Sequence, residues 1–359
     1  MKKILIILSL LALIMIFPSV NASSEQRFSV DELKDFVPNE SGEMLEDLGV
    51  DKIENSLDFD FRDLIGEAAE ILTSKYVNPL KIMILSMLII ILSSFLLSFY
   101  DDISQMIELS GAVSICIMVF PYMTRLLWDS AKISSAISVF VLSSIPIYAV
   151  LLIAGGKPSF SGSFTSISMF TANVFTSLCN SVIIPFMSVF LGLSVSSVFS
   201  HINIKNLCEN IYKIFKWLLI SGVSIFSTII SMQSALSVAT DKLASKTVKL
   251  IAGTTIPIVG TAFGEAVSAV QNSLGILKSG AGAFGILACL CIFLPAIIEL
   301  CLWLFSFQLT LVVADFFSYA KIKDLMEILI IVIKILMAIL MSFFIIALVI
   351  SAITIFSGN

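Results

Sequence analysis

Long apolar runs, separated by short polar stretches, dominate the chain. A run of about 18 or more apolar residues is typical of a membrane-spanning helix. The runs lie at about 82–99, 109–128, 133–153, 166–199, 217–237, 250–263, 281–314 and 328–356. The pattern predicts an all-α fold, with a polytopic membrane domain over residues 81–359 that contains about six to eight apolar segments.

Two of these runs are too long for one plain crossing. The runs 166–199 and 281–314 each correspond to roughly 50 Å of helix, whereas the hydrocarbon core is about 30 Å thick. Each run contains a proline near its middle, Pro185 and Pro295. Two interpretations are open: a long tilted helix that projects from the bilayer, or a Pro-broken helix whose halves meet within the membrane.

The first 22 residues have the pattern of an export signal. Lys2 and Lys3 precede an apolar run at 4–17, and Pro18 ends this run before it is long enough to span a bilayer as a helix. Small residues then predict cleavage after Ala22. An uncleaved signal anchor is the alternative, and in both cases the next segment is exported.

The exported segment, residues 23–80, is strongly acidic. It contains 15 Asp and Glu against five Lys and Arg, a charge of −10, whereas the whole chain carries −5. Ser29 and Glu32 have the spacing of a capping box that opens a short helix. A second helix is expected over 58–76, ended by Asn78-Pro79, with an apolar face formed by Phe61, Ile65, Ala68, Leu72 and Tyr76. We interpret the segment as a small helical docking arm, and a solvated acidic linker is the alternative.

The membrane part contains an internal repeat. Pro146 and Pro257 each stand between two isoleucines, 111 residues apart, and each precedes one of the long runs. Downstream, nine identities relate residues 200–226 to residues 318–344, and they include Lys-x-Leu-x-Glu in both copies. The pattern predicts a duplication with units at about 132–235 and 243–351. Whether the units are parallel or inverted depends on whether 250–263 crosses the membrane.

Composition excludes several classes of protein. The chain is 58% hydrophobic and 13% charged, and its mean hydropathy is +1.05, which a soluble protein cannot bury. All six cysteines lie outside the exported segment and His201 stands alone, so we expect packing cysteines, no metal site and no cofactor. No nucleotide-binding loop or nucleophile triad is present, and we expect neither enzymatic activity nor nucleic-acid binding.

Four charged residues lie within or at the edge of apolar runs, namely Glu265, Glu299, Asp315 and Lys334. Intramembrane charges indicate an ion or proton path unless they serve packing. The packing interpretation pairs Lys334 with Asp315 or with Glu299. Arg125 and Asp129 lie four residues apart on one helix and can pair locally.

The stretch 251–285 is the most distinctive. Gly260 and Gly264 form a Gly-x-x-x-Gly face that permits close helix approach. Pro257, Glu265 and Lys278 flank that face, and polar side chains follow Glu265 on the same helix. The segment is expected either to line a cavity or to pack against a partner subunit.

This stretch carries a family resemblance. The run Ile-Pro-x-Val-Gly…Glu-Ala-Val…Ser-Leu…Leu-Lys…Gly at 256–280, together with the export signal, acidic arm and polytopic region, resembles the stage III sporulation protein AE family of endospore-forming bacteria. The resemblance covers essentially the whole chain. The exported arm is its divergent part.

The resemblance implies a non-enzymatic component of a secretion-like channel between mother cell and forespore, needed for late, sigma-G-dependent transcription. It implies a multi-pass protein of the mother-cell membrane around the forespore. The implied partners are other stage III sporulation membrane proteins, including a secretion-type ATPase and ring-forming subunits, and a forespore-side channel partner. The alternative from the residues themselves is a secondary transporter built from the two repeats, with Glu265, Glu299 or Asp315 as its coupling residue.

Overall fold

The computed structural model describes residues 32–48, 61–99, 103–154, 157–199, 204–255 and 260–356. For residues 32, 40, 61–65, 197–199, 204–205, 234–255, 260–279 and 356 it describes the backbone only. Within these ranges every regular element is a helix, which confirms the predicted all-α class.

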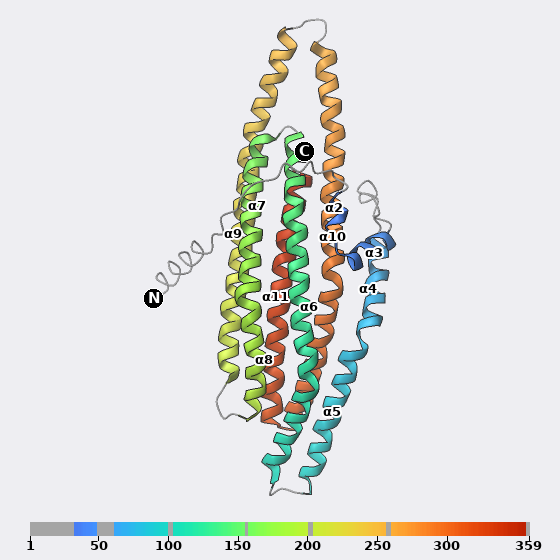
Figure 1. Ribbon diagram of the computed structural model, residues 1–359, viewed down its shortest axis with the longest axis vertical. Coiled ribbons are helices and arrows are strands. Elements are labelled where there is room, and N and C mark those ends of the chain that lie inside the picture. Colours follow the sequence, from blue (N-terminus) through green and yellow to red (C-terminus); the bar gives the residue numbers. More distant parts are fainter. Residues whose placement is uncertain are drawn as a thin grey trace, which may run out of the picture.

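Long helices run up and down side by side (Figure 1). The elements are α2 (Glu32–Asp35), α3 (Asn39–Asp47), α4 (Phe61–Lys75), α5 (Val77–Leu97), α6 (Ser104–Ala154), α7 (Pro158–Leu178), the π-helical η3 (Cys179–Ile183), α8 (Ile184–Phe199), α9 (Ile204–Thr255), α10 (Gly260–Phe316) and α11 (Ala320–Phe356). Among the described residues, six helical stretches are long and apolar enough to cross a membrane. The chain is therefore a multi-pass membrane protein.

The runs 109–128 and 133–153 are not two helices. They belong to α6, a continuous helix of 51 residues that holds both Pro121 and Pro146. The polar residues that separate the two runs are compatible with helix, and a straight helix crosses a bilayer once. At 1.5 Å per residue α6 is about 76 Å long, more than twice the hydrocarbon thickness.

The two proline-containing runs are long continuous helices, so the broken-helix interpretation is wrong. Pro295 lies inside α10, which has 57 residues. Pro185 is the second residue of α8, just after the π-helical turn η3, and α7, η3 and α8 join without a gap. The wider π turn relieves the crowding that a proline ring imposes on the preceding turn of an α-helix.

The predicted segment 250–263 is not a separate element either. Its described residues form the end of α9 and the start of α10, and Pro257 lies outside the described residues. The duplication stays a prediction, with one structural correspondence. The described residues of the related stretches 200–226 and 318–344 lead into α9 and α11, which run in the same direction (Figure 1). Units of this kind would be parallel rather than inverted.

The α11 helix is the centre of the bundle and contacts α6, α8, α9 and α10. Its close approach to α10 and α6 depends on glycine. A Cβ added to Gly282 would lie 2.5 Å from Ile355 Cγ1, and one added to Gly285 would lie 2.0 Å from the Tyr148 hydroxyl. Tyr148 and Trp303 are among the largest fully buried side chains.

The described part of the arm packs on the bundle of its own chain, and its docking role stays a prediction. Leu33 and Leu45 are fully buried, and α3 and α4 contact α10. The predicted face of the second helix is wrong in part, since Leu72 and Tyr76 are exposed while Ile71 packs against the core. Tertiary contact with α10, and not the apolar periodicity alone, decides which side of α4 is covered.

Asn78-Pro79 does not end the second helix. The α4 helix ends at Lys75, and α5 begins at Val77. Pro79 therefore lies in the first turn of α5, where a missing backbone N–H costs little.

Cysteines serve packing, as expected. Five of the six are buried, Cys301 is exposed, and all six are free thiols. His201 lies outside the described residues, as do the predicted export signal and its predicted cleavage site after Ala22.

A Schellman motif forms the turn between α10 and α11. The Tyr319 N–H donates to the Ala314 carbonyl, and the Ser318 N–H donates to the Asp315 carbonyl, both at 3.0 Å. Ser318 has a φ of 61°, the left-handed conformation in which this motif usually places glycine.

Candidate functional site

Contacts within the bundle place α6, α9 and α11 in a common register. The hydroxyls of Ser138 on α6 and Thr176 on α7 share a hydrogen bond. The neighbouring Phe175 stacks edge-on against Phe343 of α11, with ring centroids 6.4 Å apart. Gly222 of α9 lies against the same Phe175 ring. These residues therefore lie at about one height in the bundle.

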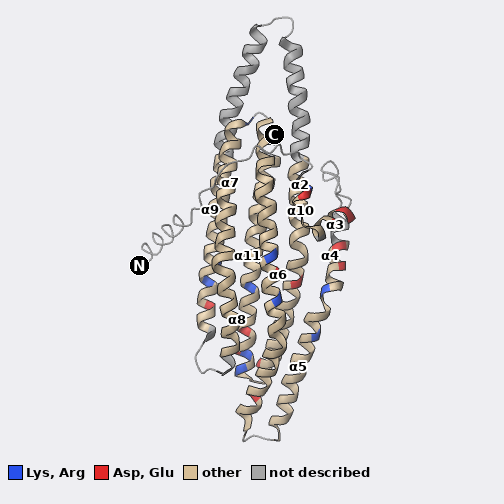
Figure 2. Cartoon of the chain, viewed as in Figure 1, with Lys and Arg blue, Asp and Glu red and all other residues tan. Residues whose placement is uncertain are grey.

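Counting back from this height gives a belt of charge. Asp129 lies nine residues before Ser138 on α6, Lys213 nine before Gly222 on α9, and Lys334 nine before Phe343 on α11. Lys132 and Lys216 each lie six residues before Ser138 and Gly222, respectively. Because the three helices run in the same direction, these side chains form one level. Among the parts of the long helices that Figure 2 colours, the charged residues are gathered in the lower part of the bundle.

Above this belt the helices carry no charged residue for several turns. The charge-free stretches are 133–154 on α6, 217–240 on α9, 279–298 on α10 and 335–356 on α11, and residues 158–199 contain none at all. The belt is thus the edge of an apolar zone and not a scatter of isolated charges.

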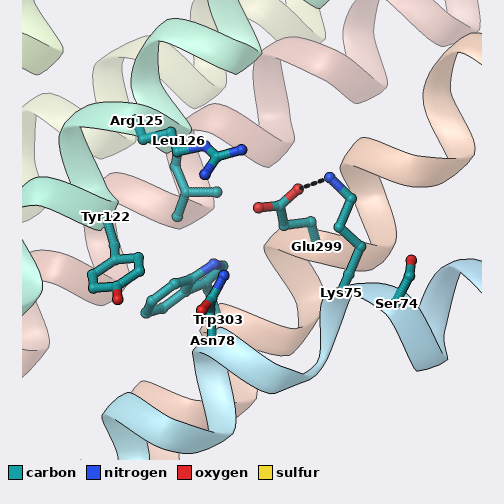
Figure 3. Close-up of a pocket in the computed structure, with 8 residues that line it drawn as sticks. All are labelled: Ser74, Lys75, Asn78, Tyr122, Arg125, Leu126, Glu299 and Trp303. Atoms are coloured by element: carbon teal, nitrogen blue, oxygen red, sulfur yellow. Dashed lines mark ion pairs between the residues drawn. The ribbon is translucent and has the colours of Figure 1, made fainter. Parts of the chain in front are cut away.

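On the arm side, the belt opens into a cleft between α4, α6 and α10 (Figure 3). A cavity of about 270 Å³ is lined by Ser74, Lys75, Asn78, Tyr122, Arg125, Leu126, Glu299 and Trp303. Lys75 Nζ lies 3.0 Å from Glu299 Oε2, and the Glu299 side chain is 22% exposed. The Tyr122 and Trp303 rings, 5.3 Å apart, form the apolar wall.

A second cavity of about 540 Å³ continues the cleft beneath the arm. It shares Lys75, Arg125 and Glu299 with the first, and adds Asn39 and Ser41 of α3. The rest of its lining comes from α6, from α10 and from the residue just before α3, namely Pro38, Asp129, Lys132, Ile133, Ala136, Cys291, Ile292, Pro295 and Ala296. The arm therefore covers a cleft lined by both acidic and basic residues, and the Lys75–Glu299 ion pair joins the last helix of the arm to the bundle.

The outer side of the arm is acidic. Glu43, Asp47 and Glu70 are exposed, and Lys34 pairs with Glu46 at 2.8 Å. Burial raises the pKa of Glu67, and the nearby carboxylates of Glu70 and Asp47 raise it further. Negative charge is thus concentrated enough on the arm to disfavour one more ionised carboxylate.

The predicted intramembrane pairs are corrected by the structure. Glu299 pairs with Lys75 and not with Lys334. Asp315 pairs with Lys323 across the turn between α10 and α11. Lys334 lines a different cavity, of about 410 Å³, between α9, α10 and α11.

The local pair on α6 is confirmed. Arg125 Nε lies 3.4 Å from Asp129 Oδ2, four residues along the helix. Both side chains border the arm cleft, so this pair and the Lys75–Glu299 pair belong to one charged cluster.

The predicted cavity helix stays a prediction. Gly260, Gly264, Glu265 and Lys278 lie on α10, in the part where the structure describes the backbone only. Among the described residues, no group of three or more His, Cys, Asp or Glu side chains is arranged to hold a metal ion.

Sequence reasoning missed two features. Lys75, the last basic residue before α5, supplies the partner of Glu299. Gly282 and Gly285 permit close helix contact. The Gly-Ala-Gly-Ala-Phe-Gly run at 280–285 is the signal that could have found them, because small residues mark tight helix crossings.

Comparison with known proteins gives a family. The chain matches the family described as Stage III sporulation protein AE over residues 41–358. A Stage III sporulation protein AE of Bacillus subtilis (strain 168) is 28% identical over 155 residues, which cover 43% of this chain and 39% of that relative. No solved structure gives a significant match.

Proposed function

Because the chain belongs to the stage III sporulation protein AE family, we propose that it is a non-enzymatic membrane subunit of a channel complex between mother cell and forespore. In this role it supports late, sigma-G-dependent transcription in the forespore. Its partners are other stage III sporulation membrane proteins, including a secretion-type ATPase and ring-forming subunits, and a forespore-side component. Family membership carries the sporulation role, and the geometry of the carboxylates supports the structural one.

A transporter would need a carboxylate that gains and loses a proton in every cycle. Glu299 instead faces an arm lysine at 3.0 Å. Asp315 is exposed at a turn, with 62% of its side chain accessible, and pairs with Lys323 eight residues on. Both arrangements tie elements together, since one joins α4 to α10 and the other closes the α10–α11 hairpin.

The Lys75–Glu299 pair separates the two functions experimentally. In a sporulating strain whose own gene is replaced, Glu299→Gln and Lys75→Gln should each lower spore yield and sigma-G-dependent reporter expression. The charge exchange Lys75→Glu with Glu299→Lys retains an ion pair but leaves no carboxylate at position 299. If the pair is structural, the exchange variant recovers most of the loss.

A coupling carboxylate gives the opposite result. The exchange variant would then be as defective as Glu299→Gln at equal protein level, and the channel-subunit proposal would fail for this site. Lys81→Gln, which alters an exposed lysine of α5, is the matched control and should sporulate normally. Purification of the wild-type chain from sporulating cells should recover the secretion-type ATPase with it, and recovery of the chain alone would contradict the channel role.

A further inference from the structure

Exposed apolar side chains extend along α6 for more than the thickness of a bilayer. Met106 is 70% exposed at one end and Ile153 is 55% exposed at the other, with Ile117, Trp128 and Val139 exposed between them. At 1.5 Å per residue this face is about 70 Å long. Even a helix tilted by about 40° spends only about 40 Å in a hydrocarbon core of about 30 Å. Lipid therefore cannot cover the whole face.

The arm shows that lipid does not surround the bundle at every height. Asn39 and Ser41 of α3 line the same cavity as Ile133 and Ala136 of α6, so α3 lies at the lower end of the charge-free zone. Because α3 exposes ionised side chains, its outer side is in water or against protein. The bundle continues upward beyond this hydrated level, with apolar side chains still exposed.

The arm side and the α9 side lie on opposite sides of the bundle (Figure 2) and differ in net charge. The arm side combines acidic residues with exposed apolar ones, namely Glu43, Asp47, Glu70, Leu72, Tyr76 and Val77; we call it the acidic flank. The α9 side carries three exposed lysines, Lys213, Lys216 and Lys334, beside the exposed apolar residues Ile214, Trp217 and Ile220. Glu209 lies 3.8 Å from Lys213, and Glu209 and Glu327 line the cavity that Lys213 and Lys334 also line. Three lysines against two glutamates leave this side net basic, and we call it the basic flank.

The two flanks also lie at matching heights. Lys216 is level with Lys132 of α6 by the register given above, and α3 covers Ile133 and Ala136, which are within about one turn of Lys132. A neighbour rotated about an axis parallel to the bundle would therefore bring the flanks together without a vertical shift. Heterologous contacts of this kind generate closed rings when the rotation closes.

We propose that copies of this chain associate side by side, with the acidic flank of one copy against the basic flank of the next, and form a closed ring. Unlike charges set the order of the copies, and the apolar side chains around them supply the buried area. A second copy satisfies both flanks at once. A basic partner protein on the arm would leave the α9 side uncovered.

Charge reversal on each flank tests this proposal on the full chain. One variant carries Lys213→Glu and Lys216→Glu, and the other carries Glu43→Lys and Asp47→Lys. Each protein is made in a host without other sporulation proteins, extracted with its lipids, and examined by crosslinking and native mass spectrometry. The wild type should form oligomers, and each variant should lose them by about tenfold or more at the same concentration, a change of about 1.4 kcal/mol.

Two rescue experiments distinguish loss of the ring contact from misfolding and from binding of a different partner protein. A chain with all four reversals has complementary flanks again and should recover the oligomer. Coexpression of the two reversed variants should give mixed oligomers, because each variant then meets a complementary flank on the other. Lys81→Glu on α5 is the control and should leave the oligomer unchanged.

The outcomes that overturn the proposal are distinct from failure of the channel role. A monomeric wild type, single-flank variants that assemble normally, or a fourfold variant that does not recover would each reject ring formation through these flanks. None of these results depends on sporulation or on the secretion-type ATPase.

Discussion

Gly285 provides a sharp test of how the central helices pack. In the native protein the Tyr148 hydroxyl of α6 points at this glycine and lies 3.5 Å from the Ala281 carbonyl and 3.4 Å from the Ser351 hydroxyl. A Cβ at position 285 would lie 2.0 Å from the Tyr148 oxygen and 2.7 Å from the Ser351 oxygen. Gly285→Ala therefore cannot be accommodated unless α10 moves away from α6 and α11 or the tyrosine is displaced.

The magnitude follows from two terms. Overpacking of a tight core costs about 1–3 kcal/mol, and displacement of a buried hydroxyl from its partners adds about 0.5–1.5 kcal/mol. We expect Gly285→Ala to destabilise the protein by about 2–4 kcal/mol. Gly162→Ala and Gly192→Ala are matched controls, because nothing lies within 4 Å of either new Cβ, and helix propensity should make them neutral or more stable by up to about 1 kcal/mol.

Thermal denaturation of the solubilised full chain measures the effect. Adding Tyr148→Phe removes the clashing oxygen, so the double variant should recover part of the loss, and the cycle should show a coupling energy of about 1 kcal/mol or more. If Gly285→Ala melts together with the two control variants, the close contact between these helices does not exist.

Three further predictions concern the turn, the arm and the cleft. Ser318→Gly should stabilise the α10–α11 turn by about 1 kcal/mol in the same melting assay, because glycine adopts the left-handed conformation without strain; an unchanged melting point contradicts this. Because the pKa of Glu67 is raised, the folded arm holds the Glu67 proton more tightly than the unfolded arm. The stability of the arm, measured by limited proteolysis, should therefore fall as the pH rises from the ordinary glutamate pKa through the raised one. Glu67→Gln should abolish this part of the pH dependence. Lys75→Gln should expose Cys291, which is buried under the arm, to thiol reagents. If the Lys75–Glu299 pair contributes about 1 kcal/mol, the rate of labelling at Cys291, followed by mass spectrometry, should rise about fivefold. Equal labelling rates in Lys75→Gln and in the Lys81→Gln control would show that the pair does not hold the arm.

The helical class and the positions of the apolar runs could be predicted from sequence because lipid-exposed helices must be apolar on nearly every side. How those runs join could not. The sequence shows 109–128 and 133–153 as two separate apolar runs, yet both belong to the continuous helix α6, along which Arg125 and Asp129 bond to each other. Helix is compatible with a few charges when they pair with one another or lie at a level where water reaches them.

Proline was a weaker signal than expected for a similar reason. In a soluble helix an interior proline costs about 3 kcal/mol and marks a break. Pro121, Pro146 and Pro295 lie inside helices here, and Pro185 follows a π turn. Where no water competes for backbone groups, a helix that loses one hydrogen bond is still better than a broken helix that loses several.

Ion partners show most clearly where sequence reasoning stops. In the α10–α11 hairpin, residues about equally far from the turn at Ser318 lie at about one height, as Asp315 and Lys323 do in their ion pair. The same counting places Lys334 within about a turn of Glu299 in height, yet Glu299 faces α4 and Lys334 faces α9. Height follows from counting, but direction around the axis follows from which stripe of a helix is apolar, and α11 is apolar on almost every side beyond its first turns. When a helix has no polar stripe, contacts with its neighbours determine its rotation about its own axis. The partner of Glu299 is therefore Lys75 of the arm, more than two hundred residues away in sequence.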